Sequence, residues 1–388
     1  MEITPEQELL RKQVREFCQK EVKPIAAAVD QEAKFPAETL RKAAALGLFG
    51  VPVNPEYDGV GAGYTGYCLV LEEIARACMS HAVIIGAHTS LCALPIQNFG
   101  TPEQKEKYLR KLAKGEMLGA FALTEPGAGS DAAAIKMGAA KKGGEWALNG
   151  TKIWITNGAE ADVTIVLAVN DPVLGARGGV TAFLVDKGTP GFRVGSNFEK
   201  MGIRGSSSTE LVFENCRVPE ANVLGRVGEG FRVATSTLYS GRLTLGAGCL
   251  GGSTSATEEA AKYAKERVAF GQPIAKFQAI QFKIADMAVG LHAMRTLVYD
   301  LAAKMDAPKG LPREQLERES AIVKLFCSEV SHDIVDEALQ VHGGMGYSKE
   351  FPVERYYRDQ RVVEIFEGTS EIQRLIISED VLKRGVGH

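Results

Sequence analysis

The periodicity of this chain changes twice along its length, and this order restricts the fold more than any other feature. Apolar residues recur at helical spacing before about residue 120 and again after Gly228. Between about 121 and 225, short β-branched and aromatic runs alternate with Gly, Pro, Asp and Asn. We therefore predict a multidomain α+β fold with an N-terminal α-helical domain, a central β-barrel or sandwich domain and a C-terminal four-helix-bundle domain, over residues 1–118, 119–228 and 229–388.

Local patterns predict the elements within these parts. Thr4-Pro5 with Gln7 is a capping-box helix start. Asn149-Gly150 predicts a hairpin that joins two strands within 145–156. Further strands are expected at 163–169, 180–185, 192–194 and 210–213. Long helices are expected at 231–264, 278–304, 314–341 and 370–383.

Charge and apolar patterning argue against several classes of protein. A net charge of −3 and a pI near 6.2 give no electrostatic reason to bind nucleic acid. No apolar run approaching the roughly 20 residues of a membrane span is expected. Glu2, Glu6 and Glu8 interrupt any secretory signal. We predict a cytoplasmic protein, or a mature form in the mitochondrial matrix if the chain is a processed eukaryotic protein.

The seven cysteines show neither C-x-x-C pairing nor a His-rich neighbourhood. This pattern favours small buried hydrophobes or free thiols over zinc ligands or disulfides, so no metal is expected.

Two segments contain residues that packing alone does not explain. F-A-L-T-E-P-G-A-G-S-D at 121–131 places glycines where a backbone can approach a flat or charged group, although it could also be a loop entering the β region. K-I-W-I-T-N-G at 152–158 places a tryptophan between β-branched residues, where it is either core or a stacking partner for a planar cofactor.

A third segment, I-F-E-G-T-S-E-I-Q-R at 365–374, contains Glu367 just ahead of a helix that we expect Ser370 to cap with Gln373 as its box partner. Glu367 has two interpretations. It either complements the helix N-terminus, or it is a base whose pKa is raised by an apolar wall.

In combination the segments are more specific than each is alone. The chain resembles the acyl-CoA dehydrogenase family from its N-terminal helices to Leu382, and the helical, β, helical order is that family's architecture. The segments that match its signatures, in order, are 121–131, 152–158, 267–278, 340–346 and 366–373.

The resemblance implies FAD as the cofactor and Glu367 as the catalytic base. Residues implied to bind FAD are Phe121, Leu123, Thr124, Gly129, Ser130, Trp154, Ile155, Thr156, Arg267, Phe270, Gln278, Gln340, Val341, His342, Gly343, Gly344, Thr369, Ser370 and Glu371. Those at 267–278 and 340–344 are implied to reach FAD from a neighbouring subunit. Residues implied to contact acyl-CoA are Ser130, Tyr239, Arg242 and Gly368.

The reaction implied is α,β-dehydrogenation of an acyl-CoA thioester to trans-2-enoyl-CoA, typical of fatty acid metabolism. Glu367 would remove the α proton while the β hydride passes to flavin N5. The backbone N–H of Glu367 and a flavin ribityl hydroxyl would hold the thioester carbonyl. The resemblance further implies a homotetramer, as a dimer of dimers, and an electron-transfer flavoprotein as acceptor. The run from Gly241 to Leu243 favours short, branched or cyclic acyl chains.

Three positions depart from patterns seen among relatives. Some members carry the base immediately before Arg242, where this chain has Gly241, which leaves Glu367 as the candidate. Tyr239 replaces a frequent acidic residue, and Phe277 replaces a histidine. The first alters the details of the implied CoA contact, and the second removes one possible polar contact to the cofactor.

Three alternatives are weighed against this function. An acyl-CoA oxidase-like enzyme would pass electrons to oxygen, but the usual oxidases carry an extra C-terminal domain. A nitroalkane-oxidising relative would carry Asp as its base. A non-catalytic relative kept for assembly would not need an intact base or intact flavin segments.

Overall fold

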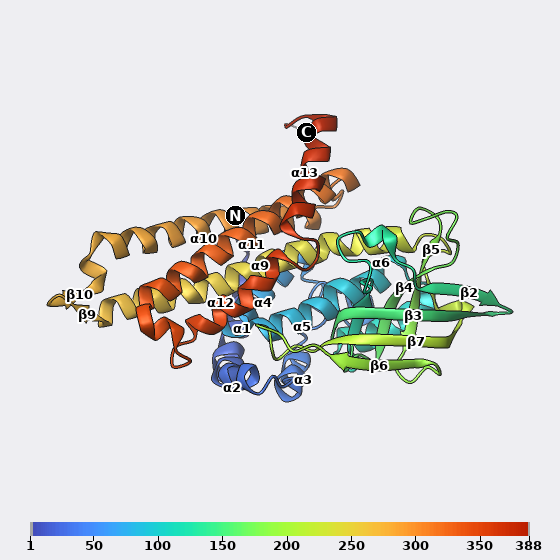
Figure 1. Ribbon diagram of the computed structural model, residues 1–388, viewed down its shortest axis with the longest axis horizontal. Coiled ribbons are helices and arrows are strands. Elements are labelled where there is room, and N and C mark those ends of the chain that lie inside the picture. Colours follow the sequence, from blue (N-terminus) through green and yellow to red (C-terminus); the bar gives the residue numbers. More distant parts are fainter. Residues whose placement is uncertain (1–2, 387–388) are drawn as a thin grey trace.

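The computed structural model describes residues 3–386 and confirms helices at both ends with a sheet between them (Figure 1). The capping box at Thr4 is present, since the Thr4 hydroxyl accepts a hydrogen bond from Gln7 N at 3.2 Å. The N-terminal helices are α1 (Pro5–Phe17), α2 (Ala26–Gln31), α3 (Ala37–Ala45), α4 (Gly63–Ala77), α5 (Met79–His88), α6 (Leu94–Phe99), α7 (Pro102–Gln104) and α8 (Arg110–Ala113).

The central part is one curved sheet with the order β6-β7-β3-β2-β4-β5-β8, and β1 pairs with β4. Its strands are β1 (Gly119–Ala122), β2 (Gly138–Lys142), β3 (Glu145–Thr156), β4 (Val163–Val169), β5 (Val180–Asp186), β6 (Phe192–Asn197), β7 (Ser208–Pro219) and β8 (Val223–Leu224). Most neighbouring strands are antiparallel, but β4 is parallel to both β1 and β2.

The hairpin predicted at Asn149-Gly150 is wrong. Residues 145–156 form one continuous strand, and the pairing of β3 with β7 shifts register at this point. Gly150 has φ of 149°, and a Cβ there would lie 2.8 Å from Met137 Cγ, so the glycine is needed for a bulge rather than a turn. Pairing with a distant strand therefore outweighs the local turn signal.

Alternation along the strands gives β4 two buried faces. Ile165 packs in a cluster with Tyr108 of the N-terminal helices, whereas Val166 packs with Trp146 and Phe213 inside the curve of the sheet. The curved sheet therefore encloses a core of its own, as a barrel or sandwich does. Its other face packs against the N-terminal helices.

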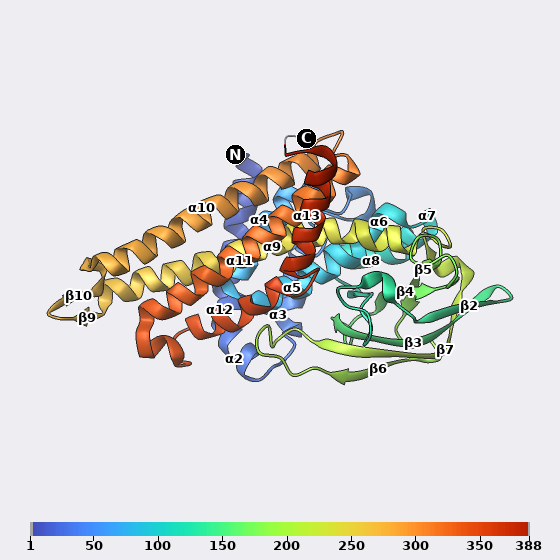
Figure 2. The same cartoon turned by 45° about the horizontal axis from the view of Figure 1, so that its top comes forward.

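Long helices complete the chain: α9 (Gly230–Glu266), α10 (Gln278–Asp306), α11 (Arg313–His342), α12 (Val353–Gln360) and α13 (Ser370–Arg384). A small hairpin of β9 (Val268–Ala269) and β10 (Gln272–Pro273) joins α9 to α10. Figures 1 and 2 show this hairpin at the opposite end of the molecule from the large sheet.

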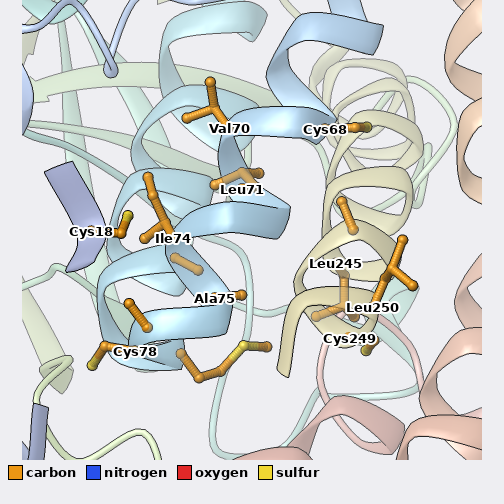
Figure 3. Packing of buried hydrophobic residues seen from close by; sticks show 14 of the residues in the cluster. Cys18, Cys68, Val70, Leu71, Ile74, Ala75, Cys78, Leu245, Cys249 and Leu250 are labelled. Carbon is orange, nitrogen blue, oxygen red and sulfur yellow. The ribbon is translucent and has the colours of Figure 1, made fainter. Parts of the chain in front are cut away.

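The N-terminal and C-terminal helices share one core. Figure 3 shows Cys68 and Ile74 of α4 beside Leu245 and Cys249 of α9. Because all seven cysteines are buried free thiols, they act here as small apolar side chains, as predicted.

The expectation that no apolar run approaches the length of a membrane span is wrong. Helical residues 79–99 form a 21-residue stretch that is long and apolar enough by length and composition alone. However, 83% of its most apolar window is buried inside the protein, which is the environment of a core helix.

Candidate active site

Glu367 lies in a turn that leads into α13. Its φ is 54° and that of Gly368 is 93°, so two consecutive residues have left-handed backbones. The predicted cap at Ser370 is wrong: Thr369 is the N-cap, and its hydroxyl accepts from Ile372 N at 3.4 Å. Gln373 donates instead to the carbonyls of Glu367 and Gly368.

The carboxylate of Glu367 points at α9. A side chain at position 241 would overlap Glu367 Oε2, and its Cβ would also lie 3.0 Å from Leu91 Cδ2. Gly241 therefore makes room for the carboxylate, and Leu91 forms an apolar wall beside it. Leu91 belongs to the π-helical turn Thr89–Ala93 that follows α5, and such turns are frequent at functional sites.

Near neutral pH, the Glu367 carboxyl group is present in both its ionised and its protonated form. Burial raises the pKa of Glu367 to about 7, against the opposing effect of the Arg242 and Lys324 charges. Oε2 has no hydrogen-bond partner among residues 3–386, and the same holds for Arg242 Nε and Lys324 Nζ. A buried carboxylate and two unpaired cations thus share a region of low dielectric, which is typical of a site that binds a polar ligand.

The backbone of the turn also fits the implied role. Within the described chain, Glu367 N donates no hydrogen bond. It is therefore free to donate to a substrate carbonyl, as the resemblance implies.

A cavity of about 350 Å³ borders the N-terminal part of α9. Ser240, which precedes Gly241, lines it together with Tyr239. Leu94, Phe99 and Leu316 supply apolar walls, and Arg313 supplies a cation. The cavity can therefore take an apolar chain that carries polar or anionic groups.

The segment at 121–131 is tied to the segment at 152–158 by a buried ion pair. Lys152 Nζ donates to Glu125 Oε1 at 2.7 Å and to Leu123 O at 2.9 Å. Glu125 also accepts from Lys136 N and Met137 N, so one carboxylate holds both ends of the glycine-rich loop. The loop itself is exposed at Gly129 and Ser130, where a Cβ on the glycine would meet nothing.

Trp154 is not a core residue. Its indole is 53% exposed and stacks on Phe198 at 4.1 Å between ring centroids. Its φ of 60° is unusual for a bulky residue and accompanies a second irregularity in the β3–β7 pairing. An exposed aromatic ring held in a strained conformation beside an open glycine loop fits a planar cofactor such as FAD.

The structure brings the predicted residues into two groups. Those at 121–130 and 154–156 lie on β1, in the loop that follows it and on β3, and Ile155 is buried. Arg267, Phe270 and Gln278 lie on or beside the distant hairpin, which places them far from Trp154 within one chain (Figure 1).

The segment 340–344 belongs to the hairpin end as well. The His342 ring stacks on Tyr263, near the end of α9, at 4.4 Å between ring centroids. Because the side chains of Val341 and His342 are buried, only Gln340 and the glycines Gly343 and Gly344 are exposed for contact there. Phe277 packs its ring edge against Phe270.

Several residues of the site were not predicted. Leu91 and Phe198 reach it only through tertiary contacts and gave no local signal. Lys324 did give one, because it is a single lysine in the apolar run A-I-V-K-L-F-C at 321–327. A fully buried lysine is rare, and buried ionisable groups are concentrated at functional sites.

Three family models match consecutive parts of this chain. They describe the N-terminal, middle and C-terminal domains of acyl-CoA dehydrogenase and match residues 4–116, 120–216 and 228–382. An acyl-CoA dehydrogenase of Bacillus subtilis is 46% identical, over 98% of this chain and 99% of the relative. A short-chain-specific acyl-CoA dehydrogenase of Clostridium acetobutylicum is 45% identical, over 98% and 99%.

Two solved structures agree in fold over the whole length. Butyryl-CoA dehydrogenase from Megasphaera elsdenii superimposes with a TM-score of 0.95 at 40% identity, covering 98% of this chain and 99% of that one. A chain from a study of the electron transferring flavoprotein of Acidaminococcus fermentans has a TM-score of 0.96 at 40% identity, covering 99% of both chains.

The fold, the buried carboxylate and these matches define the class: the chain is an FAD-dependent oxidoreductase that acts on a CH–CH group. More narrowly, it belongs to the acyl-CoA dehydrogenase family.

Replacing Lys152 with Met tests the anchoring of the flavin segments. The Glu125 carboxylate would stay buried without its cation, so we expect the free energy of unfolding to fall by about 3–5 kcal/mol. We also expect weaker binding of added FAD. Lys141→Met is the control, because its pair with Glu220 is exposed and contributes less than about 1 kcal/mol. Urea unfolding and FAD titration check both, and equal effects of the two variants would contradict the anchoring role.

Proposed function

We propose that Glu367 is the base that removes the α proton of a short-chain acyl-CoA. The observation that carries this proposal is the Glu367 carboxylate itself, which is buried, aimed at Gly241 and without a partner at Oε2. A pKa of about 7 lets it accept a proton near neutral pH and release it again. Relatives named for short-chain and butyryl substrates support a short acyl chain.

The α proton of a thioester is only weakly acidic, so the base needs help from donors at the carbonyl. The free Glu367 N–H is one donor in this proposal. A donor that is aimed at developing negative charge in a dry site contributes about 3–4 kcal/mol. Arg242 and Lys324 favour the ionised base, and Leu91 keeps water from it. FAD, when bound, supplies the redox chemistry that takes up the β hydride.

We assign FAD to two groups of residues in this proposal. The loop at 121–131 with Trp154 and Thr156 would hold the flavin end of one chain. Arg267, Phe270, Gln278 and the segment 340–344 would reach it from a second copy. The Phe270 side chain is 96% exposed, which supports a partner or ligand that covers it. Thr369, Ser370 and Glu371 would flank the cofactor near the base.

Further assignments follow the family. We propose a homotetramer with domains over 1–118, 119–228 and 229–388. We propose an electron-transfer flavoprotein as acceptor, which the relative solved in a study of such a flavoprotein supports. A cytoplasmic location stays a prediction. The acyl-CoA would contact Ser130, Tyr239, Arg242 and Gly368, with part of it in the cavity beside Ser240.

Glu367→Gln tests the base directly. We expect yellow, folded, FAD-bound protein whose flavin is bleached by butyryl-CoA about 10²–10⁴-fold more slowly, because the amide cannot take the α proton. Glu379→Gln, on an exposed position of α13, is the matched control. Stopped-flow absorbance of the flavin measures the rate. Undiminished bleaching in Glu367→Gln would remove this residue from the role.

A substrate panel tests the acyl chain. We expect kcat/KM to be at least about tenfold higher for butyryl-CoA than for palmitoyl-CoA, because a misfit of a single methylene already costs about 1–3 kcal/mol. The rate is followed with an electron-transfer flavoprotein as acceptor. A preference for palmitoyl-CoA would overturn the short-chain assignment, and rapid peroxide formation in air would favour an oxidase.

The pH profile tests the electrostatics of the base. Because only the carboxylate form accepts a proton, kcat/KM should rise as the pH rises through about 7 and then level off. The Arg242 charge lowers the pKa of Glu367, so Arg242→Gln should move the rise to higher pH. Lys324 is the other charged group that acts on this carboxylate. An unchanged midpoint in Arg242→Gln would contradict this account.

A further inference from the structure

Gln373 is fully buried in the first turn of α13, yet it is not a helix cap. Its Nε2 group donates to Glu367 O at 3.2 Å and to Gly368 O at 2.9 Å. The cap is supplied separately by Thr369, whose hydroxyl accepts from Ile372 N. The amide of Gln373 therefore serves the turn that precedes the helix.

That turn is strained. Glu367 has φ of 54° and Gly368 has φ of 93°, and a non-glycine residue keeps a left-handed backbone only where its surroundings enforce it. A Cβ on Gly368 would lie 2.5 Å from Gln373 Nε2, so the amide fits closely against the turn. With both carbonyls held on this side, Glu367 N makes no hydrogen bond within residues 3–386.

Stability alone does not account for a glutamine at this position. Among the described residues, Gln373 Oε1 is buried without a partner, and an unsatisfied buried oxygen is unfavourable. An apolar side chain of similar size would avoid that cost but could not bond the two carbonyls. A polar group that is buried at a cost in stability, as Gln373 Oε1 is, is expected mainly at functional positions.

We infer that Gln373 is a positioning residue for the base, because its side-chain amide fixes the reversed turn at Glu367–Gly368 and thereby sets where the carboxylate and the Glu367 N–H lie. This inference rests on the proposed role of Glu367. It adds a residue that touches neither substrate nor cofactor and acts only through the turn.

Two variants test it. Gln373→Glu is nearly isosteric but replaces the donor with an acceptor, and Gln373→Leu removes the hydrogen bonds while filling the space. In FAD-loaded protein with butyryl-CoA, we expect kcat to fall by about 10²-fold with little change in KM, as a misplacement of about 1 Å produces. In Gln373→Leu, which adds no charge, we also expect the rise of the pH profile to move to lower pH as the carboxylate leaves its apolar wall. FAD affinity should stay unchanged.

Gln281→Glu is the matched control, since Gln281 Nε2 donates to a single carbonyl, that of Ala275, at an exposed place on α10. If Gln373→Glu does not fold, Gln373→Leu carries the test. Activity of Gln373→Leu within about threefold of the parent protein, or a loss that merely tracks loss of FAD, would overturn the inference. Bleaching that persists in Glu367→Gln would instead contradict the proposed role of Glu367. Failure of that role is therefore distinguishable from failure of the inference about Gln373.

Discussion

The structure depends on the glycines of α9, because neighbouring segments pack directly against the helix backbone at these positions. A Cβ on Gly246 would lie 2.7 Å from Val323 Cγ1 of α11, and one on Gly251 would overlap the carbonyl of Glu72 on α4. At Gly241 the same absence admits the Glu367 carboxylate. Glycine destabilises a helix interior, so several glycines in a long helix are tolerated only where tertiary packing offsets that loss of stability. One helix thereby sets the position of the N-terminal helices, of α11 and of the base.

Much of the fold could be predicted because it follows from periodicity. The order of helical and β parts, the four long helices and the strand at 163–169 all come from local repeats that long-range contacts reinforce. The hairpin at Asn149-Gly150 and the cap at Ser370 were wrong for different reasons. In the first case pairing with the distant strand β7 decided the geometry, and in the second Thr369 caps α13 while Gln373 bonds the preceding turn.

The site was predictable to a lesser degree. Glu367 and Trp154 lie in segments with distinctive residues, and the structure gives both an environment that packing alone would not require. Lys324, Leu91 and Gln373 act on the base from other elements or through the backbone. No sequence pattern records which helix face meets which turn, so these contributions emerge only once α9, α11 and α13 are placed together.

The distance between Trp154 and the hairpin that carries Phe270 bears on how the protein acquires its cofactor (Figure 2). On the proposed assignment, each copy holds half of a flavin site at either end, so a single chain offers no complete one. Cofactor loading and subunit association are then linked by mass action, and each strengthens the other. Dilution would release flavin together with subunits, and the holoenzyme would resist heat better at higher protein concentration.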